Sequence, residues 1–325
     1  MGIHNTPSGY TNVPDWNHAY PANDMIPHQD PELPAPSRRR FFQAATLLTG
    51  GLALGGLIEG CSSPDTDPFS LRPSWEQDFT AMPDGPLDQR YWNIDTGTRI
   101  PGYNKELEAL TQRIQNVRIQ NGTLILQGQR EQHPYEGRYF TSGRVTTKRT
   151  FRYGKLEVDA QLPAGQGTWP AIWLLPLGQG RYDPQHFGIN PRSNSAWGIN
   201  GEIDICEARG SQPGIVTSTL HNYTTLITGR MPPAYHTQTA VPNSSTTFNT
   251  YGIERTPKRI TFTLNGKPYH TIQKTSDNPA IWPFDQPYNL ILNLALGGTY
   301  GGPVVGNGPW KMDIKTVRFF RLTRH

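Results

Sequence analysis

The chain has 325 residues, enough for one large β domain or two smaller ones, and its 33 Gly and 30 Pro suit many strands joined by turns. Only 17% of the residues are charged, and the formal net charge is +4 with Lys and Arg scattered along the chain. The absence of a basic stripe in the sequence argues against nucleic-acid binding. Two cysteines, Cys61 and Cys206, allow one disulfide at most, which excludes a disulfide scaffold.

The first sixty residues have the pattern of an extension followed by an export signal. Residues 1–36 are rich in Pro, Asn, Asp and His without an apolar period, which predicts a disordered extension. Residues 37–61 begin with "SRRRFF" and continue into an apolar run too short for a membrane span, which resembles a twin-arginine export signal. The segment "LIEGC" resembles a lipoprotein box and makes Cys61 a candidate lipid anchor, although Glu59 departs from the usual small residue. We therefore expect a periplasmic, extracellular or lipid-anchored protein, with a soluble form cut nearby as the alternative.

Residues 62–74 are dominated by Pro, Ser and Asp, which predicts a linker, and residues 75–325 then predict one domain large enough for an enzyme. Two hairpins are indicated where apolar and polar residues alternate around an Asn-Gly pair, at 121–122 and at 265–266. The segment "NKELEALTQRI", residues 104–114, predicts one short turn of helix. Many short strands without helical crossovers predict an all-β fold, an antiparallel β-sandwich of two packed sheets.

The segment "GEIDICEARG", residues 201–210, carries three carboxylates at uneven spacing. On a strand, Glu202 and Asp204 share a face because the side-chain period is two, whereas Glu207 would face the other way. One extra residue in a β-bulge returns Glu207 to the same face, so the spacing predicts a bulge near Ile205 and Cys206.

Three carboxylates on one face repel, so one pKa should rise and leave a protonated acid near neutral pH. A protonated acid beside a carboxylate is the pair that glycosidic bond cleavage needs, and Glu202 and Glu207 are the candidates, with Asp204 between them. A solvated charged strand is the plain alternative. A metal cluster is disfavoured because no His or further Asp lies close at ligand spacing.

The segments around this motif resemble glycoside hydrolase family 16, and among its members the bacterial laminarinase-like endo-β-1,3-glucanases. "GTWPAIWLLP", Trp197 and "GEIDICE" carry the resemblance, and "NKELEALT", "TSGRVTTK", "FRYGKLEVDAQLP", "STLHN", "YGIERTPKRITFTLNG" and "WPFDQPYNLILNLALGG" occur in family order. The resemblance implies a concanavalin A-like jelly roll with a concave substrate cleft, and a retaining endo-hydrolase of β-1,3-glucan. The six-residue motif favours the laminarinase-like side, although agar- and carrageenan-cleaving relatives share it.

The resemblance also implies roles for individual residues. Glu202 would be the nucleophile that forms a glycosyl-enzyme, Glu207 the general acid and then the base, and Asp204 the residue that orients Glu202. Sugar-binding residues are expected at Asn104, Arg144, Trp169, Trp173, Trp197, His221 and Asn293. For the tryptophans the alternative is core packing, and for His221 it is a buried structural role. Tyr300 could flank a sugar or only close its glycine-rich loop.

Relatives often bind one structural Ca²⁺, and the matching positions are Asp78, Gly122 and Asp313. The alternative for the two aspartates is hydrogen bonding at strand ends. No cofactor is expected for catalysis, and a buried free thiol is expected at Cys206.

The segment 178–197 is longer and more basic than the family pattern and should shape one end of the cleft. We expect a monomer whose partner is a β-glucan polysaccharide. The alternatives are an endo-hydrolase of a mixed-linkage glucan or a galactan, a β-glucan transglycosylase, and a glucan-binding module without activity, which the retained acid pair disfavours.

Overall fold

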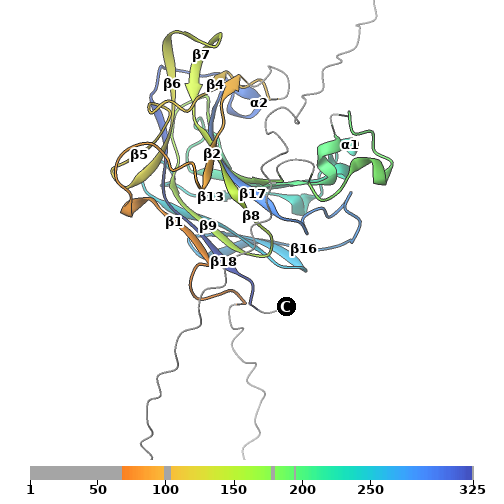
Figure 1. The fold of residues 1–325 in the computed structure, drawn as a ribbon. Helices are drawn as coiled ribbons and strands as arrows, with labels where there is room; N and C mark the ends of the chain where they lie inside the picture. The colour runs from red at the N-terminus through yellow and green to blue at the C-terminus, as the bar shows by residue number, and fades with distance from the viewer. Residues whose placement is uncertain (1–67, 99–103, 177–179, 194, 324–325) are drawn as a thin grey trace, which may run out of the picture. The chain divides into compact units, whose positions relative to one another are not determined.

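A computed structural model describes residues 68–98, 104–176, 180–193 and 195–323. The predicted extension, the export signal, Cys61 and residues 62–67 of the predicted linker lie outside these residues. The described chain forms two β-sheets with few and short helices (Figure 1), which confirms the predicted all-β sandwich.

One sheet has seven strands. Its members, in spatial order, are β13 (His236–Ala240), β12 (Ile215–His221), β11 (Glu202–Ala208), β10 (Thr168–Leu175), β17 (Tyr288–Leu296), β8 (Arg144–Phe151) and β2 (Trp92–Ile94). Neighbouring strands in this sheet are antiparallel.

The second sheet has eleven strands. Its main path is β16 (Lys267–Gln273), β15 (Arg259–Leu264), β14 (Asn249–Arg255), β9 (Gly154–Gln161), β18 (Trp310–Arg321), β6 (Thr123–Tyr135), β7 (Arg138–Ser142), β4 (Glu108–Leu110) and β3 (Gly97–Thr98). Off this path, β1 (Trp75–Asp78) pairs with β18 and β5 (Val117–Gln120) pairs with β6. The β4–β7 pair is parallel, which departs from the expected all-antiparallel pattern.

Short helices connect the strands. They are η3 (Phe79–Ala81), η4 (Pro184–Phe187), η5 (Ala196–Ile199), α1 (Tyr223–Thr228), η6 (Pro233–Tyr235) and α2 (Gly298–Gly301). In the parts of the chain that the structure describes, no helix is both long and apolar enough to cross a membrane.

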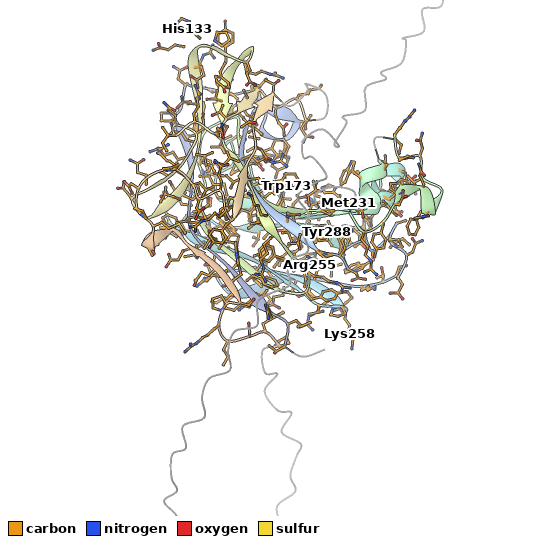
Figure 2. The ribbon with its side chains drawn as sticks, viewed as in Figure 1. His133, Trp173, Met231, Arg255, Lys258 and Tyr288 are labelled. Carbon is orange, nitrogen blue, oxygen red and sulfur yellow. The ribbon has the colours of Figure 1, made fainter. Side chains whose placement is uncertain are left out.

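The main core lies between the sheets, and the period of two selects which residues enter it. Leu290, Leu292 and Leu294 of β17 alternate into this core, and Leu156 and Val158 of β9 contribute from the opposite sheet. Each such side chain stabilises the fold by about 1.5–3 kcal/mol when fully buried. Figure 2 shows side chains throughout the described chain, including the buried Tyr288 and Arg255.

Both predicted hairpins are present. Asn121 and Gly122 join β5 to β6, and Asn265 and Gly266 join β15 to β16. All four residues have positive φ, 53° and 73° in the first turn and 51° and 73° in the second. This is the backbone that a two-residue turn with the strands' natural twist requires, and it explains the Asn-Gly choice.

Two expectations about local structure are wrong. The segment 104–114 contains strand β4 rather than a helical turn, because Glu108 and Leu110 are buried and the carboxylate of Glu108 accepts a hydrogen bond from the Leu296 N–H at 3.0 Å. The end of the predicted linker belongs to the domain, since Phe69 is buried and bridges Leu322. In both places contacts with distant strands outweigh local preference.

Candidate active site

Strand β11 contains the predicted bulge. In its pairing with β12, Asp204 lies opposite Thr219 and Glu207 opposite Thr217, so two residues of β11 face the single Ser218. The Ser218 hydroxyl donates to the Ile205 carbonyl at 2.7 Å and satisfies a backbone group that the interrupted ladder leaves free.

The bulge separates the two faces of β11. Ile203, Ile205, Cys206 and Ala208 all belong to the core between the sheets. Glu202, Asp204 and Glu207 therefore project from the opposite side, which we call the outer face of the seven-stranded sheet. The uneven spacing of the motif therefore reflects a bulged strand that keeps its acids on one side and its apolar residues on the other.

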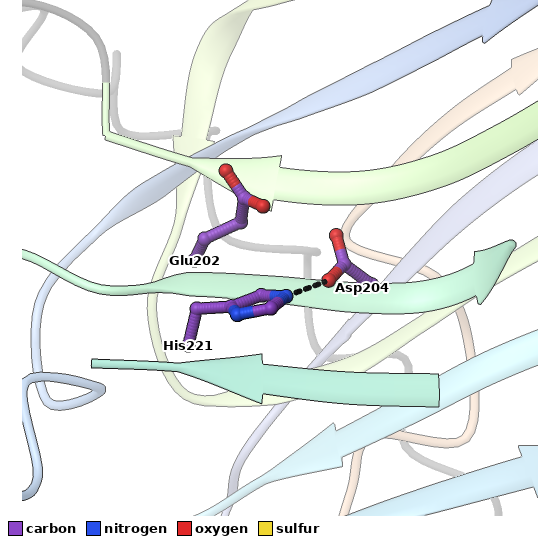
Figure 3. Close-up of side chains that lie close together, drawn as sticks. All are labelled: Glu202, Asp204 and His221. Atoms are coloured by element: carbon purple, nitrogen blue, oxygen red, sulfur yellow. Dashed lines mark ion pairs between the residues drawn. The ribbon is translucent and has the colours of Figure 1, made fainter. Parts of the chain in front are cut away.

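His221 joins the acids from the neighbouring strand. It lies opposite Glu202 in the β11–β12 register, and its Nε2 is 3.2 Å from Oδ2 of Asp204 (Figure 3). One ligand-type atom from each of Glu202, Asp204 and His221 lies within 4.8 Å of the other two. The metal-cluster alternative was disfavoured for want of a nearby His. The structure supplies that His from β12, where ligand spacing along the sequence could not reveal it.

Two tryptophans of β10 reach the outer face. Trp169 donates its indole N–H to Oε1 of Glu207 at 2.8 Å, and Trp173 donates to Oδ1 of Asn293 at 2.7 Å. The ring of Trp173 also lies 4.9 Å below the guanidinium of Arg144. Since both tryptophans contact outer-face residues, neither has the core-packing role that was the alternative.

The surroundings of the three acids raise their pKa values and so favour their protonated forms. Burial is the largest cause that raises the pKa of Glu202 and of Glu207 to about 8, and the charge of Asp204 adds to it in both cases. Burial also raises the pKa of Asp204 to about 8. The three groups are coupled, so their protons belong to the set, and the set keeps at least one proton at neutral pH. This exceeds the prediction, in which one pKa alone rises.

Charges around the acids distinguish the two glutamates. Against the effect of burial, His221 and Arg144 lower the pKa of Glu202. The pKa of Glu207 is lowered by the Trp169 hydrogen bond, by His221 and by Arg209. Arg144 is itself fixed by an ion pair with Asp95 at 2.7 Å. A cation held by a partner on the sheet is well placed to favour the ionised form of Glu202.

The remaining predicted sugar-binding residues border this set. The ring of Trp197 meets that of His221 edge to face, with centroids 6.4 Å apart. The Asn104 carbonyl accepts from the Thr299 N–H at 2.7 Å, which places Asn104 beside the loop that carries Tyr300. Tyr300 packs against Trp169 with ring centroids 5.3 Å apart.

The predicted calcium positions lie on adjoining strands away from the acids. Oδ1 of Asp78 accepts from the backbone N–H of Thr80 at 3.0 Å, which is the strand-end hydrogen bonding named as the alternative. Gly122 lies against the same turn, since a Cβ there would be 3.3 Å from Cα of Thr80. Asp313 is on β18, which pairs with both β1 and β6, and burial raises its pKa. Asp313 is half-buried, and two carboxylates with backbone carbonyls would suit a hard cation, so calcium stays a prediction.

Cys206 is a buried free thiol in the bulge, as predicted. Burial raises its pKa further, so it is an unreactive packing residue. Two hollows, of about 500 and 320 Å³, lie elsewhere and are lined by parts of 129–133 with Asn307 and Pro309, and by residues of 222–235 and 271–281. The carboxylates lie on the outer face of the sheet, where Glu202 and Glu207 are partly exposed and Asp204 is buried.

A sheet face that combines a partly protonated carboxyl set with indole rings is typical of a β-sandwich enzyme that cleaves polysaccharides. The family model "Glycosyl hydrolases family 16" matches residues 104–314. The chain therefore belongs to glycoside hydrolase family 16 and is a glycoside hydrolase.

Individual relatives agree with that assignment. The chain is 38% identical over 262 residues to a beta-glucanase of Rhodothermus marinus, which covers 76% of this chain and 84% of the relative. It is 33% identical over 244 residues to a glucan endo-1,3-beta-glucosidase of Cryptopygus antarcticus, covering 70% and 81%. The X-ray structure of the Rhodothermus marinus laminarinase superposes with a TM-score of 0.68 at 34% identity, covering 79% of this chain and 99% of that one.

Proposed function

We propose that the protein is an endo-acting, retaining β-1,3-glucanase with Glu202 as nucleophile and Glu207 as acid and base. The observation that carries the proposal is the bulge, which sets Glu202, Asp204 and Glu207 on one face beside two tryptophans. The similarity to proteins named beta-glucanase, glucan endo-1,3-beta-glucosidase and laminarinase supports the substrate.

In the first step, the protonated carboxyl of Glu207 gives its proton to the glycosidic oxygen while the C1–O bond breaks. The carboxylate of Glu202 attacks C1 and forms a glycosyl ester. The raised pKa of Glu207 keeps the required proton, and the indole N–H of Trp169 holds that carboxyl in place.

In the second step, Glu207 is a carboxylate and takes a proton from water as the water oxygen attacks C1. The C1–ester bond breaks and Glu202 returns as a carboxylate. Asp204, fixed by His221, lies between the glutamates, and it holds or releases a proton as the charge on Glu202 changes. Stacking of sugar rings on the indole faces of the partly exposed tryptophans would supply binding energy for the chain.

The substrate assignment is tested on laminarin, lichenan, curdlan, agarose and carrageenan with analysis of the products over time. We expect mixed-length oligosaccharides from laminarin and curdlan. Glu202→Gln should lose at least about 10³-fold in kcat/KM on each cleaved polymer. Cleavage of agarose alone would overturn the glucan assignment.

The roles of the two glutamates are tested with azide, a small anion that can enter the space left by a lost carboxylate. Using an activated aryl laminarioside, Glu202→Ala should yield an α-glycosyl azide, because azide then attacks C1 directly from the nucleophile's side. Glu207→Ala should yield a β-glycosyl azide, because azide replaces the water of the second step. The opposite stereochemistry would exchange the two roles.

Among the alternatives, a transglycosylase shares both steps up to the attack on the ester, and long products from laminarin would identify one. A binding module without activity is opposed by the intact acid set. Cleavage of agarose or carrageenan in the panel would favour a galactan.

We further propose export by the twin-arginine route, on the basis of the segment 37–61, with Cys61 as a candidate lipid anchor. Replacing Arg38 and Arg39 by Lys should retain the full-length chain in the cytoplasm of a bacterial host. Unchanged export of that variant would contradict the route, and absence of acylation at Cys61 would remove the anchor.

A further inference from the structure

Arg209 lies beyond Glu207, directly after the end of β11. Its side chain is exposed, and its guanidinium stacks 4.1 Å above the ring of Tyr300. Because residues two apart on a strand share a face, Arg209 shares the outer face with Glu207. Its charge is close enough to lower the pKa of Glu207.

The ring under Arg209 is held from two sides. The Tyr300 hydroxyl is 2.9 Å from Oγ1 of Thr217, the residue opposite Glu207 in the β11–β12 register. The same ring contacts Trp169, whose indole N–H donates to Glu207. Arg209 is therefore placed by the same chain of contacts that fixes the general acid, on the outer face beside Glu207.

The guanidinium of Arg209 has no acidic partner in the residues that the structure describes, unlike Arg144, which pairs with Asp95. Stacking on a ring occupies one flat face of a guanidinium, and apart from a hydrogen bond to the Tyr300 hydroxyl the N–H donors at its edge are available. Those donors form a planar fork that matches carboxylate and sulfate oxygens in pairs. A neutral hydroxyl uses the same donors with less gain.

We propose that Arg209 is a specificity-determining residue, which contacts the substrate beside the general acid and favours β-glucan chains that carry an anionic substituent there. The proposal rests on the proposed glucanase function and deepens it. An anionic group on the sugar would provide the acidic partner that the chain itself does not offer.

The experiment compares laminarin with carboxymethyl and sulfated laminarin of the same length distribution and low substitution. The readout is the ratio of kcat/KM for each charged substrate to that for laminarin, at about 20 mM and about 300 mM NaCl. For Arg209→Gln we expect the ratio to fall by about two- to fivefold at low salt, the range of an exposed ion pair. In the wild type, high salt should lower the ratio in the same direction.

Arg152→Gln is the matched control, because Arg152 is also exposed and stacks on a tyrosine, Tyr153, with centroid distance 4.7 Å. It removes the same charge away from β11 and should keep the wild-type ratio. Arg209→Lys keeps the charge without the fork and should give an intermediate ratio. Thermal melts of all variants show that each is folded.

Equal ratios in the wild type and Arg209→Gln would overturn the proposal, and so would an equal loss in Arg152→Gln, which would indicate general charge attraction. A preference for only one of the two derivatives identifies carboxylate or sulfate as the group. Cleavage of laminarin with unchanged ratios removes only the role of Arg209. Failure to cleave laminarin or either derivative removes the glucanase proposal and this inference with it.

Discussion

The two faces of strand β11 differ in what they contribute. On the inner face, Ile203, Ile205 and Ala208 join a continuous apolar core. On the outer face, Glu202 and Glu207 have raised pKa values because they are desolvated and close to Asp204. Burial of the inner face stabilises the fold. The desolvated acids of the outer face destabilise it and form an arrangement suited to catalysis.

The bulge adds one residue between Asp204 and Glu207, so deleting Cys206 should change the geometry of the acid set most severely. The deletion leaves Glu-Ile-Asp-Ile-Glu, a regular strand that keeps the three acids on one face but loses the local bend and extra twist of the bulge. We expect kcat/KM on laminarin to fall by at least about 100-fold because the two glutamates lose their relative placement, measured by reducing-sugar release, with calorimetry to show that the variant is folded. Cys206→Ala keeps the residue count and should retain most of the activity. Unchanged kcat/KM in the deletion variant would contradict the role of the bulge.

Replacing His221 should have the next largest effect, because this residue of β12 contacts Asp204 of β11. His221→Gln should reduce kcat/KM by about 10- to 100-fold, because Asp204 and Glu202 lose the group that orients them. It should also move the pH–rate profile to higher pH, since His221 lowers the pKa of both Glu202 and Glu207. A lowered rate with an unmoved profile would show a packing role only.

The raised pKa values of the outer-face acids should make the stability of the fold depend on pH. The pKa of Glu202 is about 8 in the folded protein against 4.5 for the free side chain. Because Glu202 is coupled to Asp204 and Glu207, the folded acid set holds protons that the unfolded chain has released between these values. Its stabilising contribution is therefore present at low pH and is lost as the pH rises through about 8. Glu202→Gln removes this loss.

The measurement is the melting temperature of Glu202→Gln and wild type at pH 5 and pH 8.5. The variant should gain on the wild type at pH 8.5 and gain less at pH 5. Asp159→Asn is the control. Burial also raises the pKa of Asp159, but this carboxyl lies in the eleven-stranded sheet, outside the acid set. A pH-independent difference for Glu202→Gln would contradict the raised pKa.

The smallest expected effect concerns the opposite sheet, where Asp78 and Asp313 are candidate calcium ligands. With the weak affinity typical of extracellular sites, about 10 mM CaCl₂ should raise the melting temperature by about 3 to 8 °C. Asp313→Asn should remove that increase, whereas Thr80→Ala, which removes only the hydroxyl that donates to Oδ1 of Asp78, should keep it. An identical melting temperature with calcium and with EDTA would refute the site.

Local patterns were sufficient where the physical cause was local. The uneven spacing of Glu202, Asp204 and Glu207 indicated the bulge, and the two Asn-Gly pairs indicated turns with positive φ, because these features depend only on the period of a strand and on backbone sterics. Strand β4 was missed because, besides the two-residue β3, its contacts are with β7 and the end of β17, which are distant in sequence.

Contacts across strands explain what the sequence left open at the site. The approach of His221 to Asp204 depends on the β11–β12 register, which is offset by the bulge itself. The stack of Arg209 on Tyr300 joins residues almost a hundred positions apart, and neither residue type alone indicates the other. The fold class and the acid motif could be predicted, whereas the groups that tune the acids required the paired strands.

The central claim is that Glu202 and Glu207 act on the same anomeric carbon in two successive displacements. The most direct test is a ¹H NMR time course of anomeric protons during hydrolysis of a laminari-oligosaccharide. Two displacements predict that the β-anomer of the new reducing end forms first and that the α-anomer grows only at the rate of mutarotation. First appearance of the α-anomer would show a single displacement by water and would contradict the assignment of Glu202 as nucleophile.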